Sequence, residues 1–276
     1  MAAARFAVLA LIVIVLGGCV GAGPAVAPET ATLADVNRLS GLQASVNTLG
    51  SEMRNAPRLL GAAAPRGFDA GWRRAMAGRF DGPRMMRTIE ARVAGRISQA
   101  DLTSLAEFYS SPVGRKAVAA EIAAARGNSP SRLAEGLRLH NQVSAREPAR
   151  LALYRRIVRA VRMEAIVAEF SDAVVDSMIA GMGAAIDDPA LRRQFLSTLR
   201  QFRAAQRTQL GTALNAGVAY AYRRLTIEEL RAYAEFLESP PARRYYGVVV
   251  PAVRSVMASE SRALGRALIE SAEAGS

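Results

Sequence analysis

The sequence predicts an all-α protein made of two similar multi-helix halves, and three observations support this fold class. Ala, Leu, Arg and Val dominate the composition, aromatic residues are only 6% of the chain, and runs of β-branched residues are scarce. This composition favours helices over strands. Eleven residues from Ala106 recur with few changes from Ala234, after a shift of 128 residues. Within both copies, apolar residues recur at helical spacing.

The first residues predict export. A short start with Arg5 precedes eleven consecutive apolar residues, Phe6 to Leu16. This arrangement is typical of a secretion signal, which we place at 1–18. An apolar run of this length is too short for a membrane-spanning helix, which needs about 20 residues.

The segment Leu16-Gly17-Gly18-Cys19 resembles the lipobox of bacterial lipoproteins, in which the cysteine is lipidated and becomes the new N-terminus. The resemblance implies a membrane anchor on Cys19 and a location in the cell envelope, facing the periplasm. Because Val20 follows Cys19 instead of an acidic residue, the resemblance favours the outer membrane over the inner one. An ordinary signal peptide with a chance cysteine is the alternative. Residues 19–29, rich in Gly, Ala and Pro, predict a flexible tether.

Cysteine and charge restrict the function classes further. Cys19 is the only cysteine, so a disulfide within the chain and a metal site of cysteines are excluded. The formal net charge is +12, nearly all from arginine, with Lys116 the only lysine. A GC-rich genome would account for the arginines, and attraction to anionic lipid or acidic envelope polymers is the functional alternative. Nucleic acid is not expected as a partner, since the chain is exported and no aromatic residues interleave with the arginines.

Each copy of the repeat begins with a helix-capping pattern. Ser98 precedes Asp101 by three residues, and Thr226 precedes Glu229 by three, as in a capping box. Apolar residues at helical spacing follow each cap: Leu102, Leu105 and Phe108 in the first copy, and Leu230, Tyr233 and Phe236 in the second. Each copy therefore predicts a helix with one buried face.

Both helices are expected to end at a Ser-Pro pair. Ser111-Pro112 and Ser239-Pro240 place a capping residue before a proline, whose missing N–H suits only the first turn of a new helix. We therefore assign these four residues a structural role at a sharp corner between two helices, once in each copy.

The pattern L-x-x-(L/Y)-A-E-F-x-x-S-P-x-x-R-(K/R), at Leu102–Lys116 and Leu230–Arg244, resembles the signature of the bacterial family catalogued as domain of unknown function twenty fifty-nine. The resemblance implies an exported, mostly helical protein of Gram-negative bacteria and supplies no catalytic residue. In the second copy Pro241 and Ala242 stand where the first copy has Val113 and Gly114. The two corners are therefore not expected to share one geometry in every detail.

Helix breakers set the expected boundaries. We predict a first helical repeat at 30–127, a bridge at 128–148, a second helical repeat at 149–270 and a tail at 271–276.

The second half is expected to contain a long antiparallel helical hairpin. Its longest uninterrupted helical candidates are 150–186, which is acidic towards its end, and 190–224, which carries arginines and no acid. A turn before Pro189 would pair them, with Asp176 near Arg200, Asp172 near Arg203 and Glu169 near Arg207. The alternative is an acidic surface facing a cationic partner and a separate basic surface facing the membrane.

Five arginines flank an apolar line at the start of the second half: Arg150, Arg155, Arg156, Arg159 and Arg162. This pattern suits a basic amphipathic helix on an anionic membrane. It equally suits a helix packed on a core with a solvated arginine face.

The inventory of catalytic residues is poor. His140 is the only histidine, and no G-x-S-x-G or phosphate-binding loop is present, so we expect no enzyme, cofactor or metal site. Glu107 and Glu235 could form a carboxylate pair or ligand site with Arg115 and Arg243. Alternatively, each Glu and the Arg eight residues later brace a corner as an ion pair.

These observations predict a non-enzymatic, lipid-anchored cell-envelope protein that acts as a helical scaffold or interaction module. Its expected partners are the membrane through Cys19 and either an envelope protein or anionic lipid. The alternative is a periplasmic binding protein that holds an apolar or anionic ligand in a cleft between the two halves.

Overall fold

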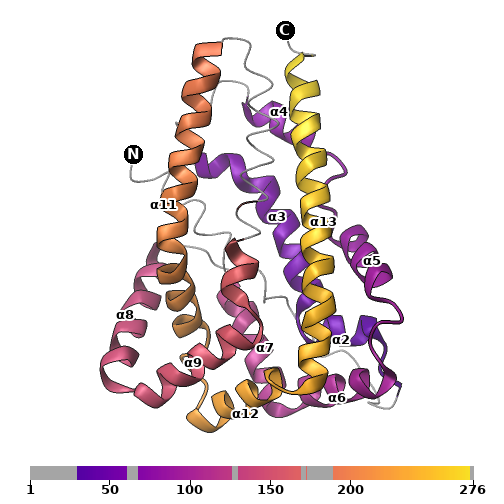
Figure 1. Ribbon diagram of the computed structural model, residues 1–276, viewed down its shortest axis with the longest axis vertical. Helices are drawn as coiled ribbons and strands as arrows, with labels where there is room; N and C mark the ends of the chain where they lie inside the picture. The colour runs from indigo at the N-terminus through magenta and orange to yellow at the C-terminus, as the bar shows by residue number, and fades with distance from the viewer. Residues whose placement is uncertain (1–29, 61–67, 126–129, 169–171, 173–188, 274–276) are drawn as a thin grey trace.

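The computed structural model describes residues 30–60, 68–125, 130–168, 172 and 189–273 (Figure 1). Within these ranges the regular structure is helical and contains no strand, which confirms the predicted all-α class. The proposed hairpin turn and the partners Glu169 and Asp176 lie outside the described residues.

Eleven helices have defined bounds in these ranges. The first group comprises α2 (Leu33–Leu39), α3 (Leu42–Leu60), α4 (Phe68–Ala75), α5 (Gly82–Val93), α6 (Gln99–Ser110) and α7 (Pro112–Ala125). The second comprises α8 (Pro130–Arg146), α9 (Pro148–Ala160), α11 (Pro189–Ala221), α12 (Ile227–Leu237) and α13 (Pro240–Glu273).

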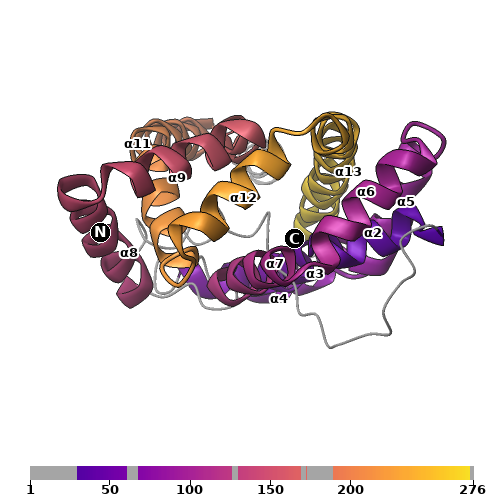
Figure 2. The same cartoon turned by 90° about the horizontal axis from the view of Figure 1, so that it is seen from below.

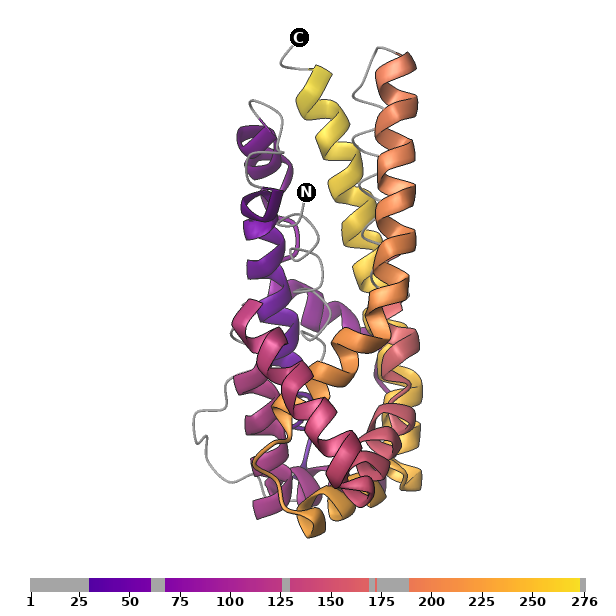
Figure 3. The same cartoon turned by 90° about the vertical axis from the view of Figure 1, so that its left-hand side faces the viewer.

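The two longest of these helices define the long axis of the molecule. Helices α11 and α13, of 33 and 34 residues, extend in this direction from a broader end (Figures 1 and 3). The broader end carries α6, α9 and α12, as Figure 2 shows from below. The two helix corners, α6–α7 and α12–α13, therefore meet at one end of the protein.

Two hydrophobic cores form the interior. The first buries residues of α2 to α6 together with most of α13, including Trp72, Phe80, Tyr245 and Leu264. The second buries residues of α8, α9, α12 and the end of α11, with part of α7.

The cores do not follow the predicted division into 30–127 and 149–270. Helix α13 follows α12 in the sequence, yet it packs against α4, α5 and α6. Helix α7 contributes to both cores, with Val118 in the first and Ala117 in the second. The second helix of each corner thus packs on helices of the other half, so the ranges do not correspond to separate cores.

The segment predicted as a bridge, 128–148, is largely helical where the structure describes it. Helix α8 occupies most of it and packs along α11. At Gly136 a β-carbon would lie 2.4 Å from the carbonyl oxygen of Ala216, so the two helix backbones approach closely where glycine allows it. This segment is part of the second core and not a linker.

The helical candidate 150–186 is interrupted in the structure. Helix α9 ends at Ala160, and Arg162 has a φ of 53°, in the left-handed region that continues no right-handed helix. Helical structure resumes at 163–168. Helix α11, in contrast, begins at Pro189, where the breaker pattern placed the start of the second candidate.

Candidate functional site

In both corners the serine caps the second helix and the proline is the first residue of that helix. Helix α7 begins at Pro112, and the Ser111 hydroxyl accepts a hydrogen bond from the Gly114 N–H at 3.0 Å. Helix α13 begins at Pro240, and the Ser239 hydroxyl accepts from the Ala242 N–H at 3.4 Å. These contacts satisfy backbone donors that the first turn of a helix leaves unpaired.

The two corners nevertheless have different geometries. The first has a single residue, Ser111, between its helices, whereas Glu238 and Ser239 separate the helices of the second. A β-carbon on Gly114 would lie 2.0 Å from the carbonyl oxygen of Phe108, so the tighter corner requires glycine. The looser corner accommodates Ala242, which is fully buried.

Aromatic rings join the two corner units. Phe108 of α6 and Phe236 of α12 are stacked, with ring centroids 3.7 Å apart and an interplanar angle of 3°. Tyr109 meets Phe236 edge to face at 5.1 Å, and Tyr233 stacks on Phe108 at 6.1 Å. The predicted apolar faces of the two copies therefore pack against one another.

Two ion pairs flank this stack reciprocally. Arg244 of α13 donates two hydrogen bonds, of 2.8 and 2.6 Å, to the carboxylate of Asp101 in α6. Lys116 of α7 lies 2.7 Å from both carboxylate oxygens of Glu229 in α12. Each cation comes from the second helix of one copy and each acid from the first turn of the other. Positions 116 and 244, like 101 and 229, are related by the shift of 128 residues.

These pairs act on the acids electrostatically. The hydrogen bonds from Arg244 hold the pKa of Asp101 below its ordinary value, and those from Lys116 do the same for Glu229. Both acids also belong to helix caps: Ser98 accepts from the Asp101 N–H, and Thr226 forms a full capping box with Glu229. The predicted caps thus also supply ion-pair partners.

The four residues considered as a site or brace are exposed: Glu107, Arg115, Glu235 and Arg243. Within the described part of the chain no ion pair joins Glu107 to Arg115 or Glu235 to Arg243. The Arg115 guanidinium instead donates to the carbonyl of Ser110. The cations that brace the corners are the next residues along the chain, Lys116 and Arg244.

A buried carboxyl lies beside the aromatic stack. Glu121 of α7 is 4% exposed, and its Oε1 accepts hydrogen bonds from the hydroxyls of Tyr222 at 2.5 Å and Tyr233 at 2.7 Å. These tyrosines come from α12 and from the residue that follows α11, so one oxygen links three parts of the second core. Burial raises the pKa of Glu121 to about 7, against the opposing effect of the two hydrogen bonds.

Further tyrosines extend this cluster towards the first core. The hydroxyls of Tyr109 in α6 and Tyr246 in α13 are 2.7 Å apart. Burial raises the pKa of Tyr109, Tyr222 and Tyr233 well above the ordinary value, so these hydroxyls stay protonated and able to donate. We call Glu121 with Tyr109, Tyr222, Tyr233 and Tyr246 the junction cluster.

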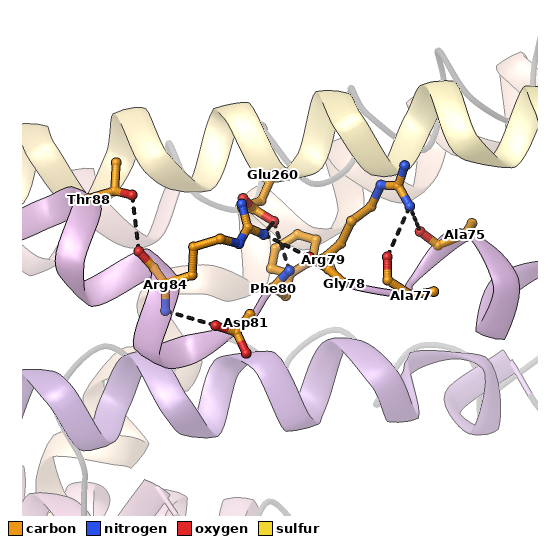
Figure 4. A network of polar contacts seen from close by, with 9 residues as sticks. All are labelled: Ala75, Ala77, Gly78, Arg79, Phe80, Asp81, Arg84, Thr88 and Glu260. Atoms are coloured by element: carbon orange, nitrogen blue, oxygen red, sulfur yellow. Dashed lines mark hydrogen bonds and ion pairs between the residues drawn. The ribbon is translucent and has the colours of Figure 1, made fainter.

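A second polar network fixes the turn between α4 and α5 to α13 (Figure 4). The Glu260 carboxylate accepts from the backbone N–H of Phe80 at 2.8 Å and from Arg84 at 2.9 Å. Phe80 has a φ of 51°, an uncommon conformation for a bulky residue. Arg79 donates to the carbonyl of Ala75 at the end of α4. The network thus holds a strained turn in place.

A pocket of about 470 Å³ lies between α2, α5 and α6, and Leu33, Val93 and Ile97 are among its lining residues. These helices belong to the first core, so the pocket does not lie between the two cores. No group of three or more potential metal ligands occurs in the described ranges. His140 contacts Ser144 at 3.4 Å, and burial together with Arg155 lowers its pKa.

Sequence reasoning missed Glu121. Its signal is visible in retrospect, because Glu121 is the only charged residue in the apolar stretch from Ala117 to Ala125. A single acid among alanines, valine and isoleucine in a helix is a candidate for burial. What the sequence could not supply was the identity of its partners, which lie about a hundred residues away.

Among the described residues, none of the helices combines the length and apolar character needed to span a membrane. The described fold is all-helical, and its two helix–corner–helix units pack reciprocally. We call the contact between them, which comprises the aromatic stack, the two ion pairs and the junction cluster, the junction. Residues 83–128, which include the whole first unit, match the family model described as uncharacterized protein conserved in bacteria (DUF2059). This match supports the resemblance found in the first copy. Neither a curated protein nor a solved structure matches the chain.

Proposed function

We propose that this protein is a non-enzymatic, lipid-anchored component of the cell envelope that acts as a helical scaffold. The observation that supports a structural role is the junction. There the polar groups of the two corners and of Glu121 form hydrogen bonds and ion pairs with other groups of the protein. The exposed carboxylates Glu107 and Glu235 have no enclosed surroundings that would prepare them for catalysis.

We further propose that the second corner unit is a second copy of the family motif. The stack of Phe108 on Phe236 supports this, since each ring occupies the same position in its copy. The reciprocal ion pairs support it independently. Two related units facing one another would make the same contact twice, as in a symmetric dimer.

The anchor is proposed from the segment Leu16 to Cys19, with the tether 19–29 leading to the helical body. Replacement of Cys19 by Ala should abolish incorporation of labelled fatty acid and release the protein from the membrane fraction. Separation of inner and outer membranes by density should place the wild-type protein in the outer membrane. Undiminished labelling of the Cys19→Ala variant would contradict the anchor.

We propose anionic lipid as the further partner, contacted through one edge of α9 and the residues after it. Arg150 is engaged with Glu147, and Arg156 forms a two-bond ion pair with Glu238. The remaining arginines of this segment are exposed and form no ion pair within the described ranges: Arg155, Arg159 and Arg162. Arg155 and Arg159, four residues apart on α9, share one edge of the helix, and Arg162 follows shortly after its end. There they would face anionic headgroups.

This partner is tested with the Cys19→Ala protein and vesicles of phosphatidylglycerol and phosphatidylcholine. Replacing the three arginines by Gln should reduce cosedimentation strongly at low salt. The matched control replaces three exposed arginines of the other half: Arg73, Arg74 and Arg87. Equal loss in both triple variants would show that only net charge matters, and no loss in either would remove anionic lipid as a partner.

A further inference from the structure

Glu121 is a buried acid with no ion-pair partner among the residues that the structure describes. Its carboxyl is held by two neutral hydroxyl donors, Tyr222 and Tyr233, and both bonds converge on the same oxygen. A buried carboxylate normally requires a positively charged partner, because burial removes the water that would stabilise its charge. The arrangement is therefore better suited to a neutral carboxylic acid than to a carboxylate.

Among the described residues of the helices around α7, no charged side chain donates a hydrogen bond to the Glu121 carboxyl. Helix α6 contributes the buried phenol of Tyr109, and α13 contributes the partly buried phenol of Tyr246. Helix α3 also packs on α7, and Arg54 of α3 is exposed. Lys116, on α7 itself, is paired with Glu229.

Helix α12 contributes Tyr233, and its Arg231 is exposed. Among the other described residues, one arginine contacts the backbone near the end of α7. Arg132 of α8 donates to the carbonyl oxygens of Ala123 and Ala124 at 3.0 and 3.4 Å, and its guanidinium lies 5.7 Å from the ring centre of Tyr220. Arg132 thus serves the backbone at the end of α7. Tyr154 of α9 meets the ring of Tyr222 and adds a further phenol. The described surroundings of the carboxyl are phenolic and apolar.

We propose that Glu121 is a proton-binding site that controls the strength of the junction, which is tight while the carboxyl is neutral and weakened once it ionises. The occupant is a proton from the surrounding medium. The controlled element is the contact of α7 with α12 and with the end of α11. An envelope protein meets external changes in pH directly, but the proposal rests on the junction cluster and not on the anchor.

The direction of the effect follows from the pKa of Glu121, which is about 7 in the folded protein against 4.5 for an ordinary glutamate. Below about pH 4.5 the carboxyl is protonated in both folded and unfolded chains. Between the two pKa values the unfolded chain loses this proton while the folded protein keeps it, so folding stability falls as pH rises. Above about pH 7 the loss is complete. The unfolding equilibrium constant should increase on the order of a hundredfold across this interval.

His140 acts in the opposite direction and must be controlled. Burial lowers its pKa, so its contribution to stability is lost as pH falls through this range. His140 is the only histidine, and a His140→Gln background therefore removes that contribution. The pH dependence of Glu121 is then measured without it.

The test is denaturant unfolding of the full-length His140→Gln protein in detergent, at about pH 5 and about pH 8. We expect lower stability at the higher pH. Adding Glu121→Gln, which keeps a carbonyl acceptor for the two tyrosines, should remove most of this difference. Adding Glu107→Gln, on the exposed face of α6, should leave it unchanged. Equal pH dependence with and without Glu121→Gln would overturn the proposal.

A second measurement does not depend on how the variants fold. Carbon NMR of glutamate side-chain carboxyls in the wild-type protein should reveal one group titrating near neutral pH, apart from those that titrate in the ordinary acidic range. Titration of every glutamate in the ordinary range would also overturn the proposal.

Discussion

Replacement of Gly114 by Ala tests the tight corner between α6 and α7. The new β-carbon would lie 2.0 Å from the carbonyl oxygen of Phe108 and 2.8 Å from the α-carbon of Tyr109. Both obstructing atoms belong to the backbone, so no side-chain rotation can relieve the clash. The corner must open, and with it the position of Phe108 against Phe236 changes.

The size of the effect follows from two opposing contributions. Overpacking in a well-packed region destabilises by about 1–3 kcal/mol, while alanine within a helix gains about 0.5–1 kcal/mol over glycine. Because the corner backbone itself must move, we place the net loss towards the upper part of the overpacking range. Each kcal/mol lowers Tm by about 2–4 °C in a protein of this size class.

The matched control is Gly247→Ala in α13. Gly247 is exposed, and a β-carbon there would meet no atom within 4 Å. This variant should therefore gain about 0.5–1 kcal/mol from helix propensity alone. Thermal unfolding followed by circular dichroism should show Gly114→Ala below wild type and Gly247→Ala slightly above it. A Gly114→Ala protein as stable as the Gly247→Ala control would refute the tight corner.

Three further predictions concern the serine caps of the corners, the Glu260 network and the ion pair of Asp101 with Arg244. Ser111→Ala should cost about 0.5–2 kcal/mol, and more than Ser239→Ala because its capping bond is the shorter one; denaturant unfolding measures both, and the reverse order would contradict the geometry. Glu260→Ala should cost about 1–3 kcal/mol by leaving a buried N–H unpaired, with Glu260→Gln closer to wild type; equal stability of the two variants would contradict this role. Reversing Asp101 to Arg or Arg244 to Asp should each lower Tm, and the double reversal should recover part of the loss at low salt; simple additivity would show that the pair is not coupled.

Local sequence signals predicted the corners well. The caps at Ser98 and Thr226 and the prolines at Pro112 and Pro240 act within three residues of themselves. Such interactions depend on backbone groups of the same segment, so the sequence contains all the partners. The difference between the corners also has a sequence origin, in the glycine at position 114.

The packing of segments distant in the sequence was harder to predict. Nothing in the segment around Tyr245 indicates that it packs with Asn37 and Ser40, yet its hydroxyl contacts both. A helix with one apolar face can bury that face against several neighbours, and the pattern alone does not choose among them. The predicted division into two sequential halves therefore gave no indication that α13 packs on helices of the first half.

The ion pairs show the same limit in finer detail. As one of two alternatives, the sequence suggested a brace within each corner, from Glu107 to Arg115 and from Glu235 to Arg243. In the structure the adjacent Lys116 and Arg244 reach across to Glu229 and Asp101. On a helix one residue changes direction by about 100°, so the choice between neighbours depends on the orientation of the partner helix.

The most direct test of the proposed function is mass spectrometry of the N-terminal peptide of the protein isolated from bacterial membranes. The account predicts a chain that begins at Cys19, lacks residues 1–18 and carries fatty acids on that cysteine. A mature chain that begins elsewhere, or an unmodified Cys19 in membrane-derived protein, would contradict the lipid anchor on which the proposed function rests.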